Sequence, residues 1–274
     1  MKQLTPIFTY LLFGLAAPTY AQLEPMDDAA LDEMVGQAYI KMDSYQDTDS
    51  HNVSRITFGQ NIQIQANADE ITLGSGGVNG AGQDFSAQNF SLGYIDSNTN
   101  QIVPFEANNP YIEWATDATN ELVGFRMGFE EAQGIIQMDL SSFSGNIAMQ
   151  GGDTYLHNGA GIGTSTSNRG THIGTNAADC TTGTSGDCIA LSALNSLSIG
   201  NPDGSGSAAS DFFFAFQPTA KNWTLSGGSS QQASKGFFIS LPTENNINTV
   251  ISNGGTQQYR TEFIDRGVGR WNSP

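Results

Sequence analysis

Residues 111–149, YIEWATDATNELVGFRMGFEEAQGIIQMDLSSFSGNIAM, decide the fold class of this chain. Apolar and aromatic residues gather there in four short runs, at 111–114, 122–129, 134–140 and 146–149. Short runs separated by polar or turn-forming residues are typical of β-strands, and none of these has the length of an ordinary helix. We therefore predict successive strands in this stretch.

The same pattern extends along the chain in both directions. We expect further strands at residues 38–42, 56–58, 62–66, 71–73, 90–94, 212–216, 223–225 and 237–241. The residues Asp96-Ser-Asn-Thr-Asn100 predict a hairpin turn, and residues 261–271 at the tail predict a short helix through Phe263 and Ile264.

A Gly/Ser/Thr-rich region near residues 151–188 interrupts the strands. It predicts long loops, with short strands around Tyr155 and His172. Regular short strands without helices indicate an all-β domain, and we predict a sandwich-like single domain over residues 38–274. An irregular β-helix is the alternative, because no fixed repeat period supports a regular solenoid.

The N-terminus predicts export. Lys2 is followed by the apolar run 7–17 and by small residues ahead of a cleavage point between Ala21 and Gln22. This order is typical of a secretory signal peptide, here residues 1–21. The mature chain is therefore expected in the periplasm, at the outer-membrane surface or outside the cell.

Residues 22–37 form an acidic segment that predicts a short helix. Asp27 or Asp28 can cap its N-terminus, where the helix dipole favours acids. Leu31, Met34 and Val35 share one apolar stripe, and Gly36 can end the helix.

The charge balance excludes two classes of partner. The chain has 10 Lys+Arg and 27 Asp+Glu, and removing Lys2 with the signal leaves 9 − 27 = −18. Nucleic acids and anionic membrane surfaces both require basic patches, so neither is an expected partner. No second apolar run after the signal is long enough for a membrane-spanning helix.

The chain has two cysteines, Cys180 and Cys188, which lie close together in sequence. In an exported chain such a pair predicts one disulfide that closes a small loop. Metal binding is the alternative, but no set of further ligands lies nearby in sequence.

A family resemblance rests on the residues that follow the signal. Residues 26–38, MDDAALDEMVGQA, resemble the opening of exported proteobacterial β-rich proteins, and residues 55–59 and 69–74 continue in the same manner. Within this group the chain resembles the A component of a pilus (Fil) system. The resemblance implies a non-enzymatic exported protein that acts through contacts with other proteins of a pilus-like or cell-surface system.

The acidic helix carries a second resemblance. Its stripe and Gly36 resemble the double-glycine leaders that exporter-associated peptidases cleave, although Gln37 stands in place of the second glycine. This implies a second processing point between Gly36 and Gln37. The alternative is a retained helix that packs its stripe against the β domain.

Metal-ligating patterns are weak. Asp96-x-Asn98-x-Asn100 begins like a calcium loop, but Gln101 replaces the required glycine and Ala107 replaces the final carboxylate. A turn is the expected structure there and at Asp47-Thr-Asp49. The three histidines, His51, His157 and His172, are not spaced as a metal pair, so we predict no cofactor.

Candidate catalytic groups are also weak. Glu113 beside Trp114, and the pair Glu130-Glu131, are the places where paired carboxylates could hydrolyse glycosides. Solvent-exposed acids are the more common interpretation of these residues. In the same way, Tyr111 and Trp223 are more often core residues than aromatic surfaces that stack on sugars. We therefore predict no enzyme, with a carbohydrate- or calcium-dependent binding module as the alternative and an exported hydrolase third.

Overall fold

The computed structural model describes residues 39–74, 82–157, 165–166, 169–176, 188–201 and 207–260. The chain divides after Gly36 into two units, and every described residue belongs to the second. The predicted signal peptide, acidic helix and C-terminal helix therefore lie outside the described residues. Within the described part, no helix has the length and apolar character needed to cross a membrane.

One strand organises the domain. β9 (Leu122–Gln150) is 29 residues long and contacts several partners in turn. Its first part pairs with β8 (Phe105–Thr116) and β16 (Phe212–Gln217), and its middle with β5 (Phe85–Leu92) and β15 (Ser196–Ile199). Its last part pairs in parallel with β19 (Gly236–Asn246), which also pairs with β16. The sheet therefore folds back on itself.

Two glycines allow β9 to bend without ending. Gly134 and Gly145 have φ angles of 138° and 156°, a region that residues with a Cβ rarely adopt. Pairing with β15 begins at Gly134, and pairing with β19 begins at Gly145. The prediction of separate strands at 122–129, 134–140 and 146–149 is therefore wrong, because the chain turns at these glycines while the ladder continues.

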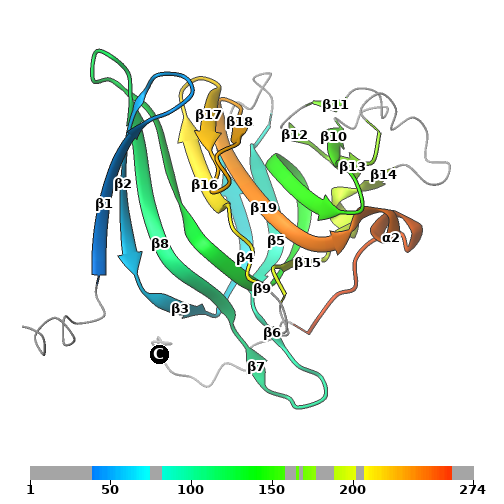
Figure 1. Ribbon diagram of the computed structural model, residues 1–274. Coiled ribbons are helices and arrows are strands. Elements are labelled where there is room, and N and C mark those ends of the chain that lie inside the picture. The colour runs from blue at the N-terminus through cyan, green and yellow to red at the C-terminus, as the bar shows by residue number, and fades with distance from the viewer. Residues whose placement is uncertain are drawn as a thin grey trace, which may run out of the picture. The chain divides into compact units, whose positions relative to one another are not determined.

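The left part of Figure 1 shows the sheet beyond β8. β2 (Asn52–Gly59) pairs with β8 along one side, and β1 (Tyr39–Gln46) pairs with β2 and forms the edge. β3 (Asn61–Ile64) extends the same side of β8. Among the described residues, the outer edge of β1 has no strand partner.

The main core lies between the two layers of the folded sheet. β4 (Ala66–Leu73), β5, β15 and the middle of β9 pack against β8, β16 and β19. Phe85 contacts Phe143 and Phe237 edge-on, with ring centroids 6.2 and 5.9 Å apart. Phe105, Phe212 and the residues of β5 therefore lie in one apolar core. This packing of two sheet layers confirms the predicted sandwich-like all-β domain, and the alternative of a β-helix is not observed among the described residues.

A second, smaller core lies on the other face of β8, β9 and β16. The hairpin of β17 (Lys221–Thr224) and β18 (Ser230–Ala233) covers it, and Trp223 of this hairpin packs against Phe213 and Phe238. Tyr111 and Trp223 are buried, as the sequence predicts for core aromatics.

The remaining elements are short. They are β6 (Tyr94–Ile95), β7 (Ile102–Val103), β10 (Tyr155–His157), β11 (Ser165–Thr166), β12 (Arg169–Gly170), β13 (His172–Gly174), β14 (Cys188–Ala190), the 3-10 turn Leu191–Ala193 and α2 (Ile247–Ser252). The short strands expected around Tyr155 and His172 are confirmed. Sequence patterning missed α2, although Asn246 caps it by accepting a hydrogen bond from the Thr249 amide.

Candidate functional site

An apolar row crosses the open part of the sheet. Cross-strand pairing aligns Met42 of β1, Ile56 of β2, Ile112 of β8, Met127 of β9 and Phe214 of β16. Directly paired residues in antiparallel strands lie on the same face, so these five side chains form one continuous apolar row. Its inner end packs on the main core through Phe214.

The apolar row becomes exposed toward the edge. Met127 is 41% exposed, Ile112 is 36% exposed, and Met42 at the open edge is 74% exposed. Ile40, the neighbour of Met42 on this face of β1, is 60% exposed. Contiguous exposed apolar surface of this kind is uncommon on monomeric proteins and typically marks an interaction site.

Charge is segregated from this face. The adjacent row consists of uncharged residues and comprises Ser44, Ser54, Trp114, Phe125 and Phe216. By contrast, Asp43, Arg55, Glu113 and Arg126 are paired in register on the opposite face. In a chain with 27 acidic residues, two uncharged rows beside an edge that no described strand covers are therefore a specific feature of this sheet.

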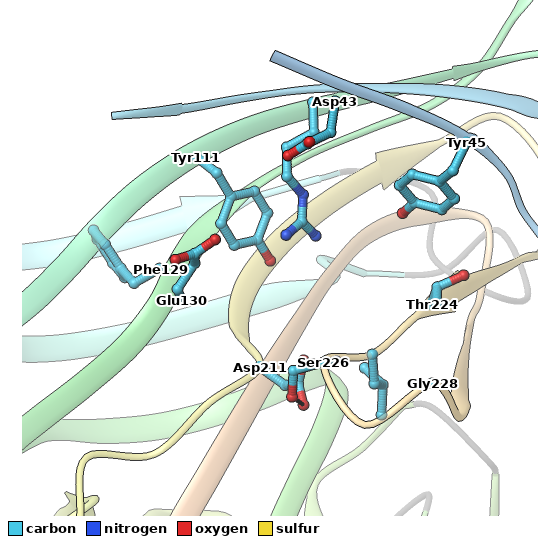
Figure 2. Close-up of a pocket in the computed structure, with 11 residues that line it drawn as sticks. Asp43, Tyr45, Tyr111, Phe129, Glu130, Asp211, Thr224, Ser226 and Gly228 are labelled. Carbon is cyan, nitrogen blue, oxygen red and sulfur yellow. Dashed lines mark hydrogen bonds between the residues drawn. The ribbon is translucent and has the colours of Figure 1, made fainter. Parts of the chain in front are cut away.

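The opposite face holds a pocket of about 530 Å³. Figure 2 shows Tyr45 and Tyr111 on one side of it, with Asp211, Ser226 and Gly228 facing them. Ser226 and Gly228 belong to the turn of the β17–β18 hairpin, and Asp211 directly precedes β16. The volume lies within the range of roughly 300–1,000 Å³ that small-molecule sites occupy.

A buried ion network forms one side of the pocket. Glu113 has no exposed surface, and it accepts hydrogen bonds from Arg55 Nε to Oε2 at 2.6 Å and from Arg126 Nε to Oε1 at 2.7 Å. Arg126 is also buried, and its Nη2 donates to the Thr224 carbonyl at 2.8 Å. The expectation of a solvated acid is therefore wrong for Glu113: it is the buried, shared counter-ion of two arginines, and each carboxylate oxygen accepts a hydrogen bond.

Aromatic rings complete the network. The Arg55 guanidinium carbon lies 4.1 Å from the Tyr111 ring centroid, and that of Arg126 lies 5.0 Å from the Trp223 ring. Burial raises the pKa of Tyr111 to about 12, so its phenol stays protonated. Burial, followed by the nearby Glu113 charge, also raises the pKa of Tyr45. Both phenols can therefore donate hydrogen bonds at neutral pH.

Asp47, Asp49 and His51 gather in the loop between β1 and β2, and they are the residues of the described chain that could together hold a metal ion. Lys221 already fills the position of a cation, because its buried ammonium donates to Asp47 Oδ2. Asp49 accepts from the Asn222 backbone and side-chain amides at 3.0 and 2.9 Å. Burial opposes the charge on Asp47, but the hydrogen bonds from Lys221 and the His51 amide keep its pKa below the ordinary value. The cluster anchors this loop to β17.

The other predicted positions have structural roles. Asp96 begins the β6–β7 turn, where its side chain accepts from the Asn98 amide at 2.7 Å, so the predicted hairpin turn is confirmed. His157 and His172 lie opposite each other on β10 and β13, although their sequence spacing gives no sign of this. Glu130 lines the pocket and accepts from Asn109, whereas Glu131 is exposed and accepts from Asn108.

Several predicted sites lie outside the described residues. They include the cleavage points at Ala21–Gln22 and Gly36–Gln37. Cys188 is the first residue of β14, but Cys180 is also outside the described part, so the disulfide stays a prediction.

Sequence reasoning missed both the apolar row and the ion network. The alternation in β1 and β2 is visible in the sequence, but the register that aligns Met42 with Met127 depends on pairing between distant segments. Arg55, Glu113 and Arg126 are likewise distant in sequence. Glu113 and Arg126 lie among apolar residues of predicted strands, and Arg55 directly precedes one. A charge at such a position is the signal that could have marked a buried pair.

No protein-family model matches this chain, and the comparisons with curated proteins and with solved structures also found no match.

Proposed function

We propose that this protein is a non-enzymatic, exported component of a pilus-like or cell-surface system, and that it binds a partner protein by β-strand addition at β1. The observation that carries the proposal is the apolar row, which contains no charged residue and runs from the core to a sheet edge that has no strand partner in the described part of the chain. The predicted signal peptide and the resemblance at residues 26–38 support the exported, pilus-like setting.

The edge has neither Pro nor a bulge to prevent pairing, and its charges are confined to one face. Natural edge strands carry Pro, bulges or charges that discourage another strand from adding. β1 reads YIKMDSYQ, contains no Pro, and pairs with β2 without a bulge over all eight residues. Its charged residues, Lys41 and Asp43, are paired with each other at 2.8 Å on the face opposite the apolar row.

These features define the partner. A strand added to β1 gains backbone hydrogen bonds along the edge, and its side chains on one face continue the apolar row beyond Met42. The partner is therefore an extended segment of another protein with apolar residues at alternate positions.

Met42→Lys tests the proposal. We expect the amount of this protein recovered with sheared, purified surface appendages from producing cells to fall at least about tenfold, because a charge on the edge disfavours strand addition. Unfolding by urea should remain within about 0.5 kcal/mol of the wild type, since Met42 is 74% exposed. Thr48→Lys adds the same charge in the exposed β1–β2 loop and should leave recovery unchanged.

Photocrosslinking identifies the occupant of the edge. With a photoreactive phenylalanine at position 42, we expect a crosslink to an alternating apolar segment of an appendage protein. The proposal is overturned if the wild-type protein is absent from the appendage fraction. Crosslinks that join only two copies of this chain would replace it with self-association.

A further inference from the structure

The pocket beside the ion network presents one arginine whose hydrogen-bonding capacity is only partly used. Arg55 lines the pocket, and its Nε is committed to Glu113. Among the described residues, its two terminal nitrogens have no hydrogen-bond partner. A guanidinium offers these nitrogens as a planar fork that can contact two oxygens of one ligand.

The ion network holds this fork in place. Arg55 is held by its hydrogen bond to Glu113 and by the face of the Tyr111 ring. Glu113 is held in turn by the hydrogen bond from Arg126. Burying one carboxylate and a whole guanidinium costs solvation energy and is weak evidence for stability alone. A guanidinium whose orientation is fixed before binding instead lowers the entropic cost of binding a ligand.

The other lining groups decide the charge of the ligand. Asp43, Glu130 and Asp211 line the same pocket as Arg55, which gives a formal charge of −2; Lys41, which pairs with Asp43 at 2.8 Å, brings it to −1, and the enclosed Glu113–Arg126 pair adds nothing. An anion would meet three carboxylates at the pocket surface. The wall therefore disfavours anionic ligands but offers both donors and acceptors to an uncharged one.

Hydroxyl groups match this mixture. Each hydroxyl can donate to a carboxylate and accept from a guanidinium or a phenol. Thr224 and Ser226 add further polar groups, and the pocket also exposes apolar surface from Phe129 and Leu225. A sugar ring has hydroxyls at its edge and C–H groups on its faces, so it satisfies both kinds of lining at once.

We propose that this pocket binds a neutral saccharide, with the Arg55 fork contacting two adjacent hydroxyls and the carboxylates of Asp43, Glu130 and Asp211 accepting from others. The site shares no residue with the apolar row, and its lining residues Asp43, Tyr45, Arg55 and Tyr111 lie on the opposite face of the sheet.

The test measures, by NMR or calorimetry, the binding of the mature protein to a panel of neutral mono- and disaccharides. The panel is built from glucose, galactose, mannose and N-acetylglucosamine. Sialyllactose serves as the anionic comparison. We expect at least one neutral sugar to bind, and Arg55→Lys to weaken it by about tenfold, because lysine keeps the charge beside Glu113 but loses the fork. Glu130→Gln, which removes a carboxylate from the rim, should weaken the same sugar.

Two controls separate the pocket from general effects. Arg260→Lys changes an arginine that contacts Asn100 away from the pocket, and it should leave sugar binding unchanged. Met42→Lys should also leave it unchanged. The proposal is overturned if no neutral sugar binds, if only sialyllactose binds, or if Arg55→Lys and Glu130→Gln, both folded by circular dichroism, bind as tightly as the wild type.

Discussion

Replacing Glu113 with Gln is expected to lower the free energy of unfolding by about 3–5 kcal/mol. The carboxylate has no exposed surface and accepts from both Arg55 and Arg126. Without its charge, two guanidinium groups face each other across a neutral amide, and Arg126 is left buried without a counter-ion. Urea unfolding followed by tryptophan fluorescence measures the loss, since Trp223 packs against this network.

Glu131→Gln is the matched control for this change. Glu131 is exposed and accepts a single hydrogen bond from Asn108, so its replacement should stay within about 0.5 kcal/mol of the wild type. A Glu113→Gln variant within about 1 kcal/mol of the wild type would show that the network does not stabilise the fold as described.

Gly145→Ala is expected to cost about 3 kcal/mol or more, because it combines overpacking with backbone strain. A Cβ at Gly145 would lie 1.9 Å from the carbonyl oxygen of Ile239, its pairing partner on β19. Relief of this clash would separate β9 from β19 where the sheet folds back. Thermal and urea unfolding measure the effect.

Gly152→Ala distinguishes the two causes. Gly152 has a similar φ of 152°, but a Cβ there would meet nothing within 4 Å. Its replacement should therefore show the backbone strain alone, about 1 kcal/mol. Equal losses for both variants would contradict the close approach of β9 and β19.

The sequence predicts much of the strand content, because apolar alternation is a local property. The runs at 56–58, 71–73, 212–216 and 237–241 all lie within observed strands, whereas the run at 62–66 is divided at Gln65 between β3 and β4. The continuity of β9 could not be predicted in the same way, since Gly134 and Gly145 are equally compatible with a break. Only the partners on both sides show that the ladder continues through these residues.

The candidate sites were harder to predict because they depend on register. Glu113 meets Arg55 and Arg126 only when β2, β8 and β9 pair as they do. The pocket adds groups from the β17–β18 hairpin, about a hundred residues further along the chain. By contrast, the turn at Asp96 was predictable, since its hydrogen bonds join residues within the turn.

Amide hydrogen exchange of β1 tests the central claim most directly. In the isolated protein, we predict that residues 39–46 exchange much faster than β8, because one edge of β1 has no strand partner in the described chain. In purified appendages the same residues should become protected by the added strand. Equal protection of β1 and β8 in the isolated protein, or no change in β1 on assembly, would contradict strand addition at this edge.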